Sequence, residues 1–324
     1  MHIADVLSPA TAIGTGVVAS AAVAVSLRRV RQSDGDRLVP LMGVMSAGVF
    51  AAQMVNFPVL PGTSGHLMGA ALTTVVLGPW AAMLAMTVVV IAQCLLFYDG
   101  GLTALGANIL NMAVAGCLSA HLVNTIVRQL IAGPAGRVAG AVVAAWSSVV
   151  MSAAMCSVEL AASGIAPLSL VFAAMTGIHS LIGVGEAWIT GTVVAFLLKV
   201  RPEMLYASEA RLGVRQLRPL VAGGMAAALL VAFCLSPLAS AAPDGLEAVA
   251  ARLGFEQAEA APPAVPMPDY QMPGLGKAWL ATSLAGIAGA MSVFGLAWLV
   301  GRGAAKARPQ DKQGQGEEIL GLGS

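Results

Sequence analysis

Charged side chains are scarce in this 324-residue chain, in which Asp, Glu, Lys and Arg together make up 10% of the residues. A soluble domain carries about a quarter. The 61 residues between Arg37 and Asp99 contain none of these four types and a single histidine. This shortage excludes an ordinary water-soluble enzyme and a disordered chain, and the net charge of +1 excludes a nucleic-acid binder. The sequence predicts a membrane protein that crosses the bilayer several times.

Paired cysteines and a basic leader are also missing. The four cysteines lie singly inside apolar runs and form no CxxC motif, so we expect small buried side chains rather than a zinc site or disulfides. Residues 1–27 contain no Lys or Arg, whereas a cleavable signal peptide begins with a basic segment. We therefore expect the N-terminus to be retained in the mature protein.

Long apolar segments are abundant, and each window of about 17 to 25 such residues is long enough to span a bilayer as a helix. We predict spans at 11–27, 38–57, 80–97, 102–127, 138–162, 175–199, 217–238 and 278–300, with a shorter one at 67–79. Gly78-Pro79 breaks the apolar run 67–97 into a short helix and a full one. The stretch 165–174 either extends the next helix or forms a short interfacial piece. The predicted fold is an all-α membrane bundle of about nine spans.

The basic residues predict the orientation of this bundle, because cytoplasmic loops are enriched in Lys and Arg. If nine spans alternate from an outside N-terminus, fifteen of the seventeen basic residues lie on the cytoplasmic side. Only Arg252 and Lys277 fall outside that set. We therefore expect the N-terminus outside and the C-terminus in the cytoplasm.

Composition divides the chain into two modules. Residues 1–199 hold seven spans with short loops, and 200–216 form a charged cytoplasmic linker. A two-span module follows at 217–300, with an outside loop at 239–276 that is rich in Pro, Ala and acidic residues. Residues 301–324 are rich in Gly and charge, which is typical of a disordered cytoplasmic tail.

Two of the four histidines fall on the predicted outer side. His2 follows the initiator methionine, which aminopeptidases leave in place before a large second residue. The Met1 α-amine, the His2 amide nitrogen and the His2 Nδ1 close adjacent five- and six-membered chelate rings. His66, in a glycine-rich loop, would supply a fourth nitrogen. Square-planar nitrogen ligation suits Ni(II) or Cu(II), and imidazole also suits Co and Zn, although a lone histidine at either position is usually without function.

Three motifs resemble the substrate-capture component of nickel/cobalt energy-coupling factor (ECF) transporters, the NikM/CbiM family. They are Met1-His2-Ile3, Gly62-Thr-Ser-Gly-His66-Leu67 and His179-Ser-Leu-Ile-Gly-Val-Gly-Glu186, and the resemblance covers about residues 1–200. The later part is similar to the small NikN-like accessory subunit, with Pro243-Asp-Gly-Leu-Glu247 and Pro268-Asp-Tyr270 in its outside loop. The resemblance implies that Met1, His2 and His66 bind the metal. A frequent family start, Met-His-Ile-Pro-Asp-Gly, differs here after Ile3, so the turn beyond the chelate differs as well.

His179 and Glu186 are two further candidates, because ionisable residues inside a membrane are usually functional. They are seven residues apart, which places them on one face of the last span of the capture module. Either they shape or gate the metal site, or they form a structural hydrogen bond between helices. The sequence leaves both readings open.

The resemblance implies a transporter component of the prokaryotic cell membrane rather than an enzyme. The chain contains no phosphate-binding G-x-x-x-x-G-K-[ST] motif and no catalytic grouping, so no catalytic or cofactor residues are expected. A membrane coupling subunit and two cytoplasmic ATPases would supply the energy, and Ni²⁺ or Co²⁺ would be the transported substrate. The alternative is a self-contained metal permease or channel, but only scattered amides such as Gln53, Gln93, Asn108 and Asn111 lie in the spans, without an acidic pathway. The fused module favours nickel over cobalt.

Overall fold

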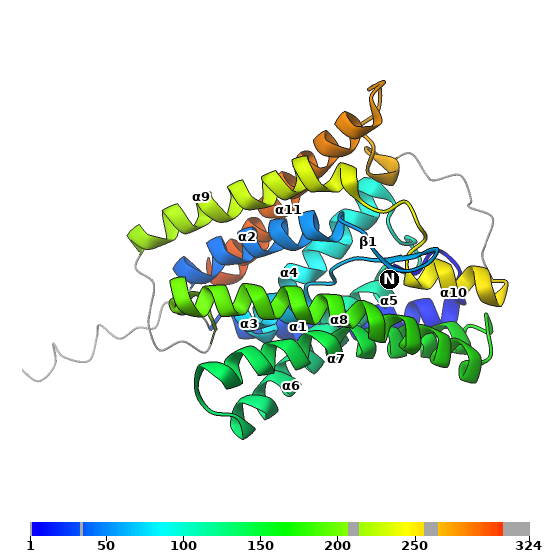
Figure 1. Ribbon diagram of the computed structural model, residues 1–324, viewed down its shortest axis with the longest axis horizontal. Coiled ribbons are helices and arrows are strands. Elements are labelled where there is room, and N and C mark those ends of the chain that lie inside the picture. Colours follow the sequence, from blue (N-terminus) through cyan, green and yellow to red (C-terminus); the bar gives the residue numbers. More distant parts are fainter. Residues whose placement is uncertain (1, 33–34, 207–213, 256–264, 307–324) are drawn as a thin grey trace, which may run out of the picture.

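The computed structural model describes residues 2–32, 35–206, 214–255 and 265–306 and consists almost wholly of helices (Figure 1). In these ranges, seven segments are long and apolar enough to cross a membrane: Pro9–Val30, Pro79–Phe97, Leu105–Leu130, Gly133–Ala162, Leu168–Val200, Leu217–Leu238 and Ala278–Ala305. Leu38–Gln53 is apolar but shorter. The all-α membrane bundle is confirmed, and the number of spans agrees roughly with the nine predicted.

The long helices pack side by side in two groups. The helices are α1 (Pro9–Val30), α2 (Gly35–Gln53), α4 (Pro79–Ala92), α6 (Gly116–Leu130), α7 (Gly133–Ala162), α8 (Leu168–Val200), α9 (Val214–Leu230) and α11 (Ala278–Lys306). Helix α7 packs against both α6 and α8, and α9 and α11 pack on α2 (Figure 1). The last two long helices of the chain therefore join the bundle mainly through α2, and α11 also contacts α4.

A glycine turn separates the short helix α3 (Ala70–Leu77) from α4, as Gly78-Pro79 predicts. Gly78 has a φ of 80°, a conformation that favours glycine, and Pro79 begins α4 at a position that needs no backbone N–H. Helix α3 begins at Ala70 rather than at residue 67, and its eight residues are too few to cross a bilayer alone. Residues 67–69 lead into it without helical structure.

Three π-helical segments interrupt the described helices, and one of them, η4 (Val231–Leu235), continues α9. The segment η1 (Gln93–Phe97) continues α4, and η2 (Ile109–Ala115) joins the short α5 (Leu105–Asn108) to α6. Such segments are rare and occur mostly as interruptions at functional sites. The buried amides of Gln93 and Asn108 lie at the starts of η1 and η2.

The predicted outside loops contain ordered structure. Strands β1 (Phe57–Leu60) and β2 (Thr63–Gly65) form an antiparallel pair before α3. The segment predicted as the loop 239–276 contains helix α10 (Gly245–Leu253) and the one-turn helix η6 (Pro268–Tyr270). The short turn η3 (Pro202–Met204) follows α8. The short turn η5 (Ser236–Leu238) ends the helical segment that begins with α9. Helix α8 begins at Leu168, so most of the ambiguous stretch 165–174 extends that helix.

Candidate metal site

The N-terminal segment is inserted into the bundle and held there by backbone contacts. The side-chain amide of Asn108 accepts from Ile3 N (2.8 Å) and donates to Ile3 O (3.0 Å), while Gly101 N also donates to Ile3 O (2.8 Å). Ile3 is fully buried. The Asp5 carboxylate accepts from the backbone and hydroxyl of Thr103 (2.7 and 2.6 Å). The contacts of Asn108 and Gly101 therefore hold Ile3, which follows His2, at both its backbone N–H and its carbonyl oxygen.

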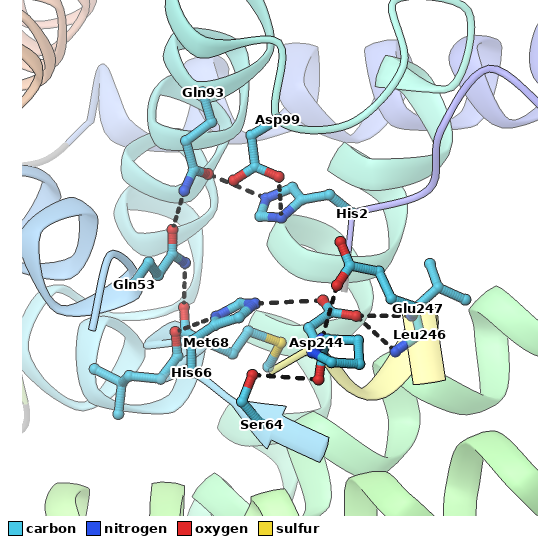
Figure 2. A network of polar contacts seen from close by, with 12 residues as sticks. His2, Gln53, Ser64, His66, Met68, Gln93, Asp99, Asp244, Leu246 and Glu247 are labelled. Carbon is cyan, nitrogen blue, oxygen red and sulfur yellow. Dashed lines mark hydrogen bonds and ion pairs between the residues drawn. The ribbon is translucent and has the colours of Figure 1, made fainter. Parts of the chain in front are cut away.

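His2 lies between a carboxylate and an amide. Its Nδ1 is 3.1 Å from Asp99 Oδ1, and its Nε2 is 3.2 Å from Gln93 Oε1 (Figure 2). Its side chain is 6% exposed. Burial alone would raise the pKa of the Asp99 carboxyl, but the neighbouring His2 imidazole and the hydrogen bond from Tyr270 outweigh burial and lower that pKa. Asp99 is therefore an ionised group placed against the His2 nitrogen that the predicted chelate would use.

The His66 loop is held by a buried carboxylate from α8. Glu186 Oε2 accepts from Met68 N (2.6 Å) and Glu186 Oε1 accepts from Gly69 N (2.8 Å). The two amides precede the first turn of α3, where backbone N–H groups have no partner within the helix. Glu186 is fully buried. The contact joins α8 to the non-helical segment that carries His66.

His66 and His2 face each other across the site. Their ring centroids are 6.0 Å apart and the rings are nearly parallel, at 18° (Figure 2). His66 Nδ1 bonds to Leu67 O at 3.0 Å, and the side chain is 13% exposed. Burial, together with nearby positive charge that includes His2, lowers the pKa of His66 to about 4, so the imidazole is neutral and able to act as a metal ligand at neutral pH.

The loop between α9 and α11 supplies a carboxylate beside His66. Asp244 Oδ2 lies 4.0 Å from His66 Nε2. The other oxygen, Oδ1, accepts from Leu246 N (2.8 Å) and Glu247 N (2.9 Å), and so caps α10. The Asp244 side chain is 17% exposed. This carboxylate therefore lies against the bundle rather than in solvent.

The same loop reaches His2 through Tyr270. The Tyr270 hydroxyl donates a hydrogen bond to Asp99 Oδ2, and its ring stacks on Phe97 with centroids 4.5 Å apart. Asp269 and Tyr270 both have positive φ values, of 50° and 56°, which are strained for residues other than glycine. The packing and the hydrogen bond hold Tyr270 in this conformation. The loop therefore lies near both histidines. Its own Asp244 is beside His66, and its Tyr270 contacts Asp99, the carboxylate beside His2.

His179 lies at the edge of the site. Its Nδ1 bonds to Met175 O at 2.8 Å, within α8. It lines a small cavity together with Gly65, His66, Met68, Asp244 and Gly245. His179 is therefore a neighbour of His66 and Asp244. Among the described residues, its ring bonds to Met175 O and not to His2.

In the described ranges, no cluster of three or more His, Cys, Asp or Glu side chains has the spacing of a metal site. Met1, which would supply the α-amine, lies outside the described residues.

Several residues of the site were not among our candidate ligands. Gln53, Gln93 and Asn108 stood out only as amides inside apolar spans, and Asp99 only as the first charge after a long neutral run. Each of them contacts the His2 or His66 segment. Their rarity in an apolar environment was the signal that could have singled them out.

Removing the Glu186 carboxylate should loosen the His66 loop. In Glu186→Leu, two buried N–H groups lose their acceptors, which destabilises the fold by about 1–3 kcal/mol for each group. We expect a lower unfolding temperature in detergent, and a smaller drop for Glu186→Gln, which keeps one acceptor oxygen. Glu159→Gln, which changes another buried carboxyl of the bundle, is the matched control. An unchanged melting curve for Glu186→Leu would contradict this role.

Comparison with known proteins matches two parts of the chain to two different family models. Residues 2–204 match the model of the CbiM family, described as the cobalt uptake substrate-specific transmembrane region, and residues 218–306 match the PDGLE domain. A putative fused nickel transport protein NikMN of Archaeoglobus fulgidus is 35% identical over 308 residues, which are 93% of this chain and 98% of that one. A fused nickel transport protein NikMN of Rhodobacter capsulatus is 34% identical over 63% of this chain and 64% of its own length.

Two solved structures align with more than half of the chain. A truncated transition metal transporter is 31% identical, with a TM-score of 0.57, over 61% of this chain and 99% of that one. A second structure, of a transition metal transporter, is 32% identical, with the same TM-score, over 62% of this chain and 93% of its own. The chain therefore belongs to the CbiM family of metal-uptake membrane components, here continued by a PDGLE domain.

Proposed function

We propose that the chain is the substrate-binding component of an ECF-type importer, which captures Ni²⁺ outside the cell and delivers it inward. The observation that carries the proposal is the pairing of His2 with His66, whose rings are 6.0 Å apart although 64 positions separate them in sequence. In a chain with four histidines, two of them meet at the inserted N-terminal segment. Cobalt is the second substrate to test.

The proposed ligands are the Met1 α-amine, the His2 amide nitrogen, the His2 Nδ1 and the His66 imidazole. Four nitrogen donors of this kind suit a square-planar Ni(II) ion. In the metal-free protein Asp99 lies against His2 Nδ1, so this carboxylate has to give up its contact when the ion binds. It then remains close enough to balance the positive charge of the ion.

The energy for transport comes, in this proposal, from partner subunits. The sequence has no phosphate-binding motif, and in ECF importers a membrane coupling subunit and cytoplasmic ATPases complete the complex. The distribution of basic residues supports an outside N-terminus and a cytoplasmic C-terminus. The site then opens toward the outer face, where the ion is captured.

The test of capture is a binding measurement on the purified, detergent-solubilised protein. We expect one Ni²⁺ per chain by equilibrium dialysis, with a visible absorption band typical of planar four-nitrogen nickel. Titration with Co²⁺ in competition ranks the two ions. Protein that retains no metal at micromolar Ni²⁺ would contradict the proposal.

The fused module, in this proposal, assists loading rather than holding the ion itself. Its described residues contribute Asp244 beside His66 and Tyr270 beside Asp99, and its sequence contains no histidine and a single cysteine, Cys234, which lies in its first apolar span rather than in the loop. Carboxylates without imidazole or thiolate are poor sites for Ni(II). We infer that residues 1–199 bind the ion and that the loop 239–276 holds both histidine segments in place.

Separating the two modules tests this division. Deleting residues 200–324 should leave an inserted capture module with much reduced uptake in cells that express the whole transporter. Supplying 200–324 as a separate chain should restore uptake, and the doubly substituted Asp244→Ala and Tyr270→Phe version should restore much less. Undiminished uptake by the deleted protein would show that the fused module is dispensable.

A further inference from the structure

The polar contacts continue beyond the two histidines into a chain of two buried glutamines. Gln53, at the end of α2, and Gln93, at the start of η1, are 5% and 1% exposed. We propose that these amides form a one-directional hydrogen-bond relay that selects the His2 nitrogen facing the metal and ties the His66 loop to it. The proposal rests on the metal capture proposed above, and names two positioning residues for it.

The direction of the relay is fixed at the Met68 carbonyl, which only accepts hydrogen bonds. Gln53 Nε2 donates to Met68 O at 2.7 Å, so Gln53 Oε1 points the other way. Gln93 Nε2 donates to that oxygen, also at 2.7 Å (Figure 2). Gln93 therefore presents Oε1 to His2. Neither amide is able to turn round without losing a buried hydrogen bond.

At His2 this direction assigns the two ring nitrogens. Gln93 Oε1 accepts, so Nε2 of His2 carries the hydrogen that it donates across 3.2 Å. Nδ1 faces the Asp99 carboxylate, which only accepts, and donates a hydrogen to it. On loading, Nδ1 gives up that hydrogen and binds the ion, while Nε2 keeps the hydrogen that it donates to Gln93. Only Nδ1 closes a six-membered ring with the His2 amide nitrogen. An acceptor placed on the second ring nitrogen is the usual way in which proteins orient a histidine ligand.

The relay also connects the two histidine segments. Met68 follows His66 by two residues, and its backbone is bound on both sides, by Glu186 at the nitrogen and by Gln53 at the oxygen. A shift of the His66 loop therefore changes the hydrogen bond that orients His2. The relay makes the positions of both imidazoles depend on one another.

A double-mutant cycle separates this role from general packing. Gln93→Met keeps the volume but removes the acceptor, and we expect nickel affinity to fall about 10- to 100-fold, as for other partners of metal-bound histidines. Gln93→Glu keeps an acceptor and should recover most of that loss. Gln53→Met should weaken binding in the otherwise wild-type chain, because the Gln93 amide is then free to turn. The same Gln53→Met change should have little effect in the Gln93→Glu background, where the carboxylate presents an oxygen in either orientation.

The electronic spectrum gives a readout that a merely structural role would not change. We expect Gln93→Met to shift or abolish the planar nickel band, while Asn124→Leu, a buried amide elsewhere in the bundle, leaves it unchanged. Wild-type affinity and spectrum in Gln93→Met would overturn the relay and leave the capture site standing. Equal effects of Gln53→Met in the wild-type and Gln93→Glu backgrounds would overturn it too. Absence of nickel binding by the wild type would instead refute the proposed function.

Discussion

Metal binding should disappear when either His2 or His66 is replaced by alanine. Each substitution removes one of only two imidazoles from the proposed four-nitrogen set. Changes to residues that merely orient a ligand weaken binding about 10- to 100-fold, so loss of a ligand itself should exceed that range. Equilibrium dialysis with Ni²⁺ on purified protein measures the loss, and nickel uptake in cells should fall to background.

The same substitution elsewhere in the bundle is the control. His121→Ala removes a histidine from α6 that has no contact with His2 or His66 among the described residues, and should leave nickel binding intact. All three variants should insert into the membrane and elute alike in gel filtration. Full nickel binding by His2→Ala or His66→Ala would remove that residue from the site.

An alanine inserted between Met1 and His2 should be as damaging as the loss of a histidine. The insertion keeps every side chain, but it moves the α-amine away from the amide nitrogen with which it closes the five-membered ring. We expect the planar nickel band to vanish and the affinity to fall by at least about two orders of magnitude, beyond the range for residues that merely orient a ligand. The measurement uses the same dialysis and absorption experiments as the histidine variants.

The position of an affinity tag gives the matched comparison. A tag before Met1 should abolish binding because it converts the amine into an amide, whereas a tag after Ser324 should have no effect. Stoichiometric nickel in a protein with an N-terminal extension would show that the α-amine is not a ligand.

The helical bundle could be predicted from local signals, since apolar length and Gly78-Pro79 each act over a few residues. The start of α3 could not, because Met68 and Gly69 are held by Glu186, 118 and 117 residues further along. Helix α10 could have been predicted from the sequence, although we expected a loop in this segment. Asp244 and Glu247 have the spacing of a capping box, and their mutual hydrogen bonds form it.

The site was predictable only in part. The pairing of His2 with His66 followed from their rarity and from the expected topology, and the two rings do face each other. The contact between Asp99 and Tyr270 spans 171 positions, and nothing local in either segment indicates it. The amide chain likewise depends on how α2 and η1 pack, which a single sequence does not specify.

The contacts of Asp244 and Tyr270 with the histidine segments have a consequence for having both modules in one polypeptide. They add to the packing of α9 and α11 on α2, which joins the two modules. Having both modules in one polypeptide converts docking into an intramolecular event, and short linkers in general give effective concentrations of the order of millimolar. The accessory module then docks on the capture module without having to find it by diffusion. Capture in the fused chain should therefore be independent of expression level, whereas capture by the split pair should rise with the amount of the accessory chain.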